Sequence, residues 1–137
     1  MPQYWILKTE PTDYSYHDLE ADGRTAWDGV KNNLALKHVR TMKQGDRALI
    51  YHTGTVKALI GEAVIVSQPY ADPGAADPRL VVVDIEPARR LGREVPLAEI
   101  KADPALAQLG LVRMGRLSVV PASSAQWKHL KGMGRKA

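Results

Sequence analysis

The segment Trp27-Asp28-Gly29-Val30 places a large aromatic side chain at a glycine-containing turn, in a chain that has no phenylalanine. An aromatic ring in such a position can stack on a flat ligand such as a nucleobase, and one such stack contributes about 1–3 kcal/mol. A base that has left its helix also needs hydrogen bonds to its Watson–Crick edge. The hydroxyl of Thr9 and the amides of Asn32 and Asn33 could supply these bonds, and Tyr51 is a second candidate aromatic. The alternative is that both aromatic side chains belong to the hydrophobic core.

Basic side chains could add contacts to the phosphates of a nucleic acid. The net charge of +4 favours polyanionic partners only mildly. A lysine or arginine that neutralises a phosphate makes binding more sensitive to salt. The candidates are Lys31, Lys37, Arg40, Arg113 and Arg116. For Lys37 and Arg40, a solvent-exposed helix face is an equally good interpretation.

The sequence offers little support for catalysis. Ser118, His52 and Asp28 could form a serine hydrolase triad on paper, but Ser118 lacks the Gly-x-Ser-x-Gly pattern of a nucleophile elbow. A phosphate-binding glycine loop is also missing from the sequence. His52 follows Tyr51 at the end of an expected strand, where a binding role and an ordinary polar strand end are both open.

The composition argues against several other classes. The chain has no cysteine, which removes disulfides and thiolate metal sites, and its four histidines lack His-x-x-x-His spacing. We therefore expect no metal and no cofactor. No apolar run approaches the roughly 20 residues of a membrane-spanning helix, and the first residues lack the layout of a signal peptide. We expect a cytoplasmic protein that does not contact a membrane.

Hydrophobic spacing predicts one domain in which strands and short helices share a core. Apolar or alternating runs predict strands at residues 4–8, 47–52, 58–67, 79–86 and 113–120. Helical spacing and capping residues predict helices at residues 15–20, 34–42, 96–101, 104–109 and 123–130. The run at 58–67 is apolar on both faces, as expected in a small closed barrel. The domain should span residues 1–131, followed by a basic, disordered tail at 132–137.

Four motifs occur in order along the chain. They are Lys8-Thr9-Glu10-Pro11, Trp27-Asp28-Gly29-Val30-Lys31-Asn32, Tyr51-His52-Thr53 and Arg113-Met114-Gly115-Arg116-Leu117-Ser118-Val119. Together they resemble the EVE domain family of the PUA-like superfamily. The resemblance extends from about Tyr4 to Leu130, which is nearly the whole chain.

This resemblance implies an α+β, PUA-like small β-barrel of five to six strands edged by short helices. It also implies a non-enzymatic module that reads a modified nucleobase in DNA or RNA through an aromatic pocket, related to the YTH readers of methylated adenine in RNA. Trp27 would stack on the base, and its polar edge would contact Thr9, Asn32 and Ser118. Further matched positions at the pocket are Asp28, Gly29, Val30, Tyr51 and His52, and those facing the nucleic-acid backbone are Lys8, Lys31, Arg113 and Arg116.

After the tryptophan turn, the chain departs from the family pattern. Asn33, Leu34 and Leu36 stand where the family tends to have tyrosine, glutamine and arginine, which removes an aromatic wall and two polar groups. The pocket is then either more open or suited to a different modification. Two other functions stay open: a general RNA-binding module without base preference, and an enzyme that acts on modified nucleotides. The sequence does not indicate any protein partner.

Overall fold

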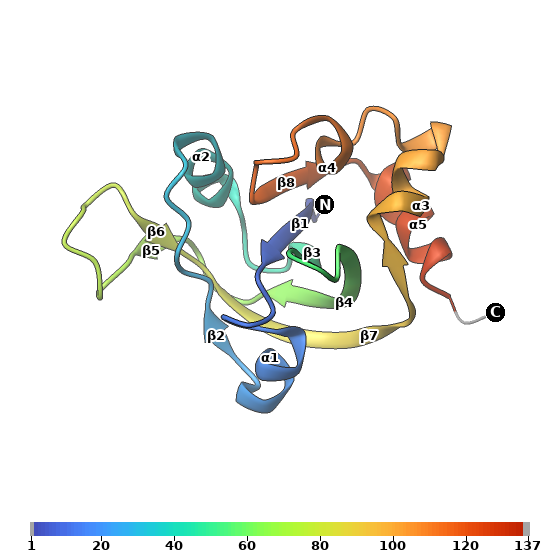
Figure 1. Ribbon diagram of the computed structural model, residues 1–137. Helices are drawn as coiled ribbons and strands as arrows, with labels where there is room; N and C mark the ends of the chain where they lie inside the picture. The colour runs from blue at the N-terminus through green and yellow to red at the C-terminus, as the bar shows by residue number, and fades with distance from the viewer. Residues whose placement is uncertain (1, 136–137) are drawn as a thin grey trace.

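The chain folds around a curled six-stranded sheet, as the computed structural model of residues 2–135 shows (Figure 1). The strands are β1 (Tyr4–Thr9), β2 (Thr25–Ala26), β3 (Arg47–His52), β4 (Ala58–Ile65), β5 (Tyr70–Ala71), β6 (Val81–Val82), β7 (Asp84–Pro96) and β8 (Val119–Ala122). The helices are α1 (Tyr16–Asp22), α2 (Asn33–Thr41), α3 (Leu97–Ala102), α4 (Gly110–Arg113) and α5 (Ser124–Met133), with a 3-10 turn at Pro104–Leu106. Within residues 2–135, no helix combines the length and the apolar character needed to cross a bilayer.

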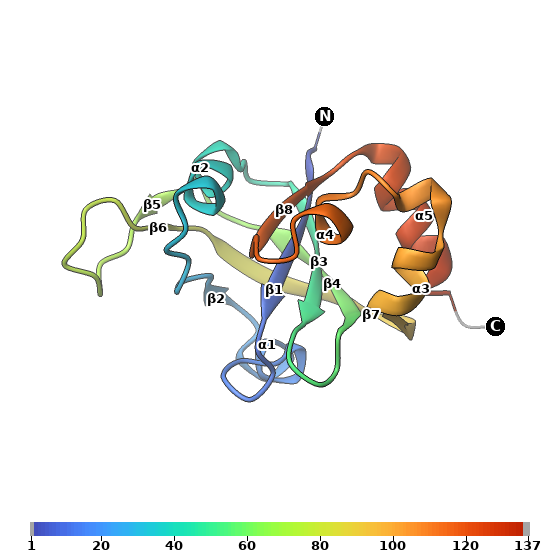
Figure 2. The ribbon, with the colours of Figure 1, turned by 45° about the horizontal axis from the view of Figure 1, so that its top comes forward.

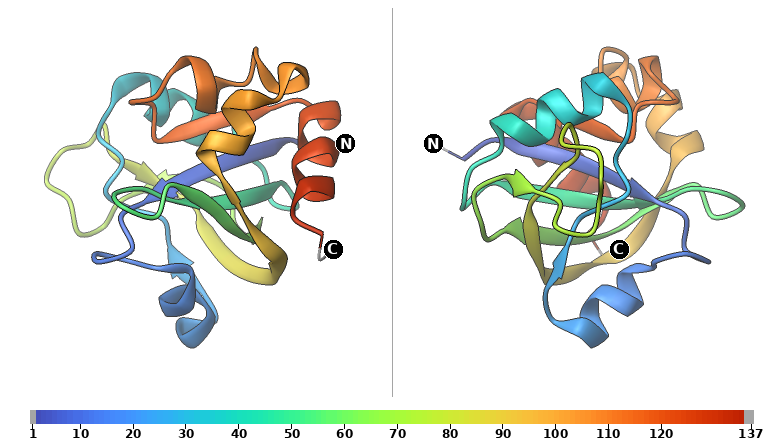
Figure 3. Two further views of the ribbon diagram at one scale, coloured as in Figure 1. Left: turned by 45° about the vertical axis from the view of Figure 1, so that its right-hand side comes forward. Right: turned by 90° about the vertical axis from the view of Figure 1, so that its left-hand side faces the viewer.

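The main sheet has the strand order β2-β7-β4-β3-β1-β8. β1 and β3 run parallel, and the other neighbouring pairs are antiparallel. Register shifts interrupt the β3–β4 and β4–β7 pairs, and such bulges bend a strand and increase its twist. The sheet curls into a half-barrel, with α1 and α2 at opposite sides of it (Figures 1 and 3). The predicted α+β class is confirmed, but the closed barrel is a half-barrel: among the described residues, the edge strands β2 and β8 do not pair.

The hydrophobic core contains all three tryptophans, and two of them lie away from the cavities described below. Trp5 and Trp127 are each 5% exposed. The indole Nε1 of Trp5 donates a hydrogen bond to the buried carboxylate of Asp46 (3.1 Å), and Trp127 stacks on Tyr4 with ring centroids 4.8 Å apart. Both indoles therefore dock segments onto the sheet and take no part in the cavities described below.

The predicted strand at residues 79–86 is divided in the structure. Val81–Val82 pairs with β5, and the loop between these two short strands projects away from the main sheet (Figure 2). β7 begins at Asp84 and continues to Pro96, far beyond the predicted end. Its second half is polar and largely exposed, so the hydrophobic alternation that marks a half-buried strand is missing there.

The predicted strand at residues 113–120 is wrong in its first half. α4 ends at Arg113, the Leu117 N–H donates to the Met114 carbonyl in a turn (3.0 Å), and β8 begins only at Val119. Met114 is 46% exposed, so the apolar residue that suggested alternation points to solvent.

The described part of the predicted disordered tail also has defined structure. α5 continues through Met133, and the Arg93 N–H donates to the Gly134 carbonyl (3.1 Å). Lys131, the last residue before the predicted tail, forms an ion pair with the buried carboxylate of Glu62 (2.8 Å). These contacts hold the end of α5 against the sheet, whereas Lys136 and Ala137 lie outside the described residues.

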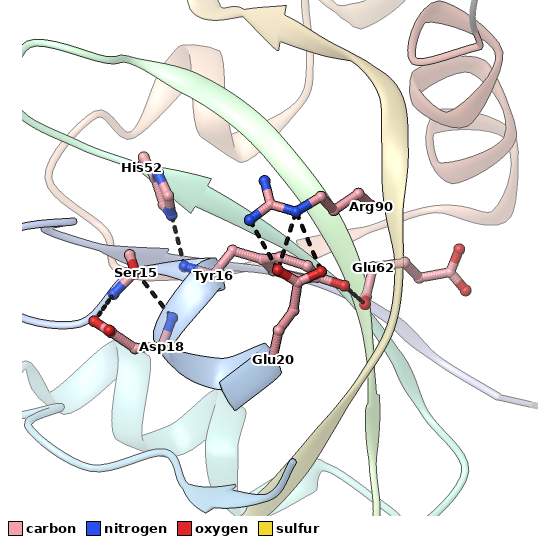
Figure 4. Close-up of polar contacts among 7 residues, drawn as sticks. All are labelled: Ser15, Tyr16, Asp18, Glu20, His52, Glu62 and Arg90. Atoms are coloured by element: carbon pink, nitrogen blue, oxygen red, sulfur yellow. Dashed lines mark hydrogen bonds and ion pairs between the residues drawn. The ribbon is translucent and has the colours of Figure 1, made fainter. Parts of the chain in front are cut away.

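A capping box fixes the start of α1, as predicted. The Ser15 N–H donates to the Asp18 carboxylate (2.9 Å), and the Asp18 N–H donates to the Ser15 hydroxyl (3.0 Å; Figure 4). Gly23 ends the helix in the left-handed region at φ +74°, and its N–H donates to the Leu19 carbonyl (2.9 Å). The position of α1 fixes the residues just before it, which line the main cavity.

Tyr16 ties α1 to the sheet by its backbone, its hydroxyl and its ring. Its N–H donates to His52 Nε2 (3.0 Å), and its hydroxyl donates to the Glu62 carbonyl (2.7 Å; Figure 4). Its ring lies against Gly61 in β4, where an added Cβ would be only 2.4 Å from the ring. The close approach of α1 to β4 therefore requires glycine at this position.

Candidate functional site

A cavity of about 440 Å³ opens between the two unpaired edges of the half-barrel. Its walls come from the end of β1, the start of the turn after β2 and the residue before β8, with the loop that precedes α1. We call it the Trp27 cavity. Pockets for small ligands typically have volumes of about 300–1,000 Å³, so it can accept a single base. The predicted site residues that it brings together are Lys8, Thr9, Trp27, Asp28, Gly29, Val30 and Ser118.

Backbone pairing and one glycine set the position of Trp27. Its N–H donates to the Val83 carbonyl (2.7 Å), which continues the β2–β7 pairing by one residue. Gly29 then adopts φ +79°, a conformation that glycine reaches without strain. The Trp27 side chain is 6% exposed, so most of the indole packs in the core and the remainder borders the cavity. The two interpretations of Trp27 from the sequence, core residue and cavity wall, are therefore compatible.

Tyr14 is a second aromatic wall that sequence reasoning missed. Its ring meets Trp27 edge to face, with centroids 6.3 Å apart and planes at 79°. Its hydroxyl donates to Asp22 (2.7 Å), and burial together with this bond raises the pKa of Tyr14 to about 12. The Thr9 hydroxyl donates to the Tyr14 carbonyl (2.7 Å), which fixes the backbone here. The available signal was an aromatic residue directly before the capping box, a position that often packs against the following helix.

Several polar groups surround the two rings. Thr25 and Ser118 contribute hydroxyls, and the exposed residues Asp13 and Asp28 contribute carboxylates. The hydroxyl proton of Thr9 is used within the fold, which leaves its oxygen as a hydrogen-bond acceptor. The cavity therefore offers both hydrogen-bond donors and acceptors beside its aromatic surface.

Lys8 carries the cation at this site. Its ammonium donates to the Gly115 carbonyl (2.9 Å) and lies 5.9 Å from the centroid of the Tyr51 ring. Burial lowers the pKa of Lys8 below its ordinary value. The β1–β8 pairing reaches this residue, because the Lys8 N–H donates to the Ser118 carbonyl (3.0 Å).

Tyr51 lies in a different cavity. This second cavity has a volume of about 220 Å³ and shares Lys8 with the first. Two further lysines, Lys57 and Lys101, line it, and we call it the lysine cavity. Tyr51 is 4% exposed, and burial raises the pKa of its hydroxyl. The structure thus separates the two aromatic residues that the sequence placed in one pocket.

His52 has a structural role that the sequence did not reveal. It is buried, and its Nε2 accepts the hydrogen bond of the Tyr16 N–H (Figure 4). Burial lowers the pKa of His52, which favours the neutral ring that this bond requires. Neither cavity includes His52 in its lining, so the predicted contact with a ligand is not supported. Among residues 2–135, no cluster of three or more histidine or acidic side chains could hold a metal ion.

The remaining predicted residues lie around a shallow groove outside the Trp27 cavity. Asn32 is the N-cap of α2, and its side-chain oxygen accepts from the Ala35 N–H (3.1 Å), so this oxygen is already engaged. Asn32, Arg113 and Arg116 line the groove together with the exposed Leu34 and Met114. The exposed Lys31 lines none of these three hollows.

The same architecture occurs in other proteins of known structure. A protein from Rhodopseudomonas palustris solved by NMR is 40% identical, with a TM-score of 0.91 over 96% of this chain and 92% of that chain. The human THYN1 protein, solved in complex with 5-methylcytosine containing DNA, is 28% identical, with a TM-score of 0.89 over 98% of this chain and 99% of that chain. The fold is therefore PUA-like, as the motifs implied, with a half-barrel in place of the closed barrel.

Sequence comparison agrees with the structural likeness. Thymocyte nuclear protein 1 of Mus musculus is 29% identical over 164 aligned positions, which cover 95% of this chain and 73% of the mouse protein. The EVE domain family matches residues 3–133, which include both edges of the Trp27 cavity. The chain belongs to the EVE domain family.

Proposed function

We propose that this protein binds a modified nucleobase in DNA or RNA without altering it, and that the Trp27 cavity holds the base after it leaves its strand. The observation that carries the proposal is the pair of perpendicular rings, Trp27 and Tyr14, bordering one cavity of suitable volume. A flat base stacked on one ring meets the other ring edge-on. The base is then oriented as well as held.

Polar groups around the rings suit the edge of a pyrimidine. Cytosine presents an exocyclic amino donor, which carboxylates accept well, and ring acceptors that hydroxyls can reach. Asp13 and Asp28 supply the carboxylates, and Ser118 supplies a hydroxyl. Because the human THYN1 structure contains 5-methylcytosine DNA, 5-methylcytosine is the first modification to test.

The experiment measures binding of labelled oligonucleotides by fluorescence anisotropy. Strands of one sequence carry cytosine or 5-methylcytosine at one position, as DNA and as RNA. We expect tighter binding of the modified strand in at least one series. The Trp27→Leu variant should lose about 5- to 150-fold in affinity, the equivalent of a stack worth about 1–3 kcal/mol.

A matched control separates the stack from general damage to the core. Trp127 is as buried as Trp27 (5% against 6%) but stacks on Tyr4, away from the cavity. Trp127→Leu should lose comparable thermal stability and keep its affinity. The exposed residue Asp28 offers a second test that leaves the core intact, and Asp28→Asn should weaken binding of the modified and the unmodified strand alike, because both bases present the same amino group.

The same measurements decide between this function and the alternatives. Equal affinity for modified and unmodified strands would indicate a general nucleic-acid-binding module. Strands recovered after incubation should have unchanged mass, and a changed mass would indicate an enzyme. Equal binding losses in Trp27→Leu and Trp127→Leu would place the base outside the Trp27 cavity.

A further inference from the structure

The lysine cavity lies directly beside the Trp27 cavity, because Lys8 lines both. Its other two lysines reach it from separate elements, Lys57 from the loop before β4 and Lys101 from α3. The buried ring of Tyr51 forms part of its wall. The two cavities therefore meet at Lys8, where a strand with one base in the first cavity would continue.

The positive charge of the lysine cavity is not neutralised within the described part of the chain. Ion pairs among residues 2–135 do not include Lys8, Lys57 or Lys101. The described residues that line the cavity include no carboxylate, and Glu10, which bonds to the lining residue Thr53 (3.1 Å), also accepts a hydrogen bond from the Thr12 hydroxyl (3.0 Å). The Lys8 ammonium has three protons, and the Gly115 carbonyl takes one of them. Three lysines that form no ion pair within residues 2–135 therefore line one small cavity.

Lys57 has an unusual backbone. It is the one non-glycine residue of the range 2–135 with positive φ, at +49°. A long side chain in this region carries strain that glycine would avoid, and such strain is concentrated at functional sites. The side chain of Lys57 lines the lysine cavity. The strained residue is therefore one of the three lysines of this cavity.

We propose that the lysine cavity binds a phosphate group, supplied by the nucleotide whose base occupies the Trp27 cavity or by its neighbour in the strand. The inference rests on the proposed function for its setting, and it adds a second subsite with its own chemistry. Ammonium groups bind phosphate as point charges, so the subsite recognises the phosphate and is indifferent to the base. Its position beside Lys8 would fix the direction in which the strand crosses the protein.

The test combines the Lys57→Gly and Lys101→Met substitutions and leaves Lys8 unchanged, because Lys8 also borders the Trp27 cavity. Lys57→Gly alone should be at least as thermally stable as the wild type, because the strain is relieved. The double variant should bind the modified strand more weakly but keep the wild-type ratio of affinities for modified and unmodified strands. Lys128→Met, an exposed lysine on α5, is the matched control and should bind like the wild type.

Salt dependence identifies the lost contact as a phosphate. Each phosphate neutralised on a single strand contributes about 0.7 to the slope of log affinity against log salt. Between about 50 and about 200 mM salt, the wild type should therefore lose about 2.6-fold more affinity than the double variant for each contact. A strand with one neutral methylphosphonate beside the modified base should bind the wild type less tightly and the double variant without further loss.

Two further ligands distinguish the source of the phosphate. The competitors are 5-methyl-2′-deoxycytidine 5′-monophosphate and the corresponding nucleoside. If the monophosphate competes better than the nucleoside, and only when both lysines are present, the cavity binds a terminal phosphate. A methylphosphonate effect without this difference assigns it to the strand. If neither effect depends on the lysines while the preference for the modified base persists, the phosphate subsite is wrong and the proposed function stands. If that preference is missing in the wild type, the proposed function itself has failed.

Discussion

His52 shows how one buried side chain can couple the start of a helix to pH. Its Nε2 accepts the hydrogen bond of the Tyr16 N–H (3.0 Å), and only the neutral ring can do so. Burial lowers the pKa of His52 in the folded protein, so at mildly acidic pH the unfolded chain binds the proton more readily. The folded state therefore loses stability as the pH falls below the ordinary histidine pKa of about 6.5. The loss stops once the pH is below the lower pKa that His52 has in the folded protein.

Replacing His52 by glutamine should remove part of this pH dependence. The glutamine oxygen can accept the same N–H without titrating, so His52→Gln should flatten the unfolding free energy between about pH 5 and 7. We expect the difference from the wild type to grow toward the acidic end and to stay below about 2 kcal/mol at pH 5, the limit for one proton over about 1.5 pH units. Urea unfolding at several pH values measures it. His17→Gln, at an exposed position of α1, should keep the wild-type slope, and an unchanged slope in His52→Gln would contradict this role.

At this scale the sequence identified the type of chemistry better than the location of each group. Trp27, Thr9 and Ser118 meet at one cavity, as the motifs implied. Tyr51 and His52 follow each other in β3, yet Tyr51 lines the lysine cavity and His52 accepts a hydrogen bond from the first residue of α1, because neighbouring residues of a strand point to opposite faces. In the sequence, a polar side chain that accepts a hydrogen bond from a backbone N–H cannot be distinguished from one that binds a ligand.

At the scale of elements, the packing of α1 on β4 depends on a single missing side chain. A Cβ at Gly61 would lie 2.4 Å from the ring of Tyr16, which is almost fully buried and bonded to the Glu62 carbonyl. Gly61→Ala should therefore destabilise the fold by about 1–3 kcal/mol, as other overpacked cores do. Thermal or urea unfolding measures the loss. Gly132→Ala in α5, with open space around the position, should leave stability unchanged or slightly higher.

A double variant tests the cause of this loss. Tyr16→Leu makes room beside residue 61, so adding Gly61→Ala to it should cost less than Gly61→Ala costs alone. Additive losses would show that the ring does not set the constraint. Because α1 positions Tyr14, loss of this contact should also weaken binding at the Trp27 cavity.

Element boundaries were predictable where hydrophobic spacing and caps agree. Ser15 and Ser123 start their helices through capping boxes, and both helices were predicted from those patterns. The second half of β7 and the turn after α4 were not predictable. Exposed polar strands, and turns near exposed apolar residues, lack a distinctive period of hydrophobic residues. Tertiary pairing with β4 keeps β7 extended there, and that pairing is not visible in a local window.

At the scale of the whole molecule, the Trp27 cavity lies at the seam between β2 and β8. If a base enters there, both sides of the seam should become protected together. Hydrogen exchange should show slower exchange at residues 25–30 and around Ser118 when a 5-methylcytosine strand is added, with little change in the central strands β3 and β4. Protection on one side alone would contradict binding across the seam, and Trp127→Leu serves as a control that retains the effect.

The open seam has a mechanical consequence for selectivity. β2 and β8 are the edge strands of the main sheet and do not pair with each other in the described chain, so moving them apart breaks no hydrogen bond of the ladder. The mouth of the cavity can therefore widen for a base with a bulkier substituent at little cost in free energy. Discrimination between modifications must then come from the rings of Trp27 and Tyr14 and from the polar groups they orient. Substitutions at those groups should change which base is preferred. A cross-link between β2 and β8 should instead change how large a base can enter.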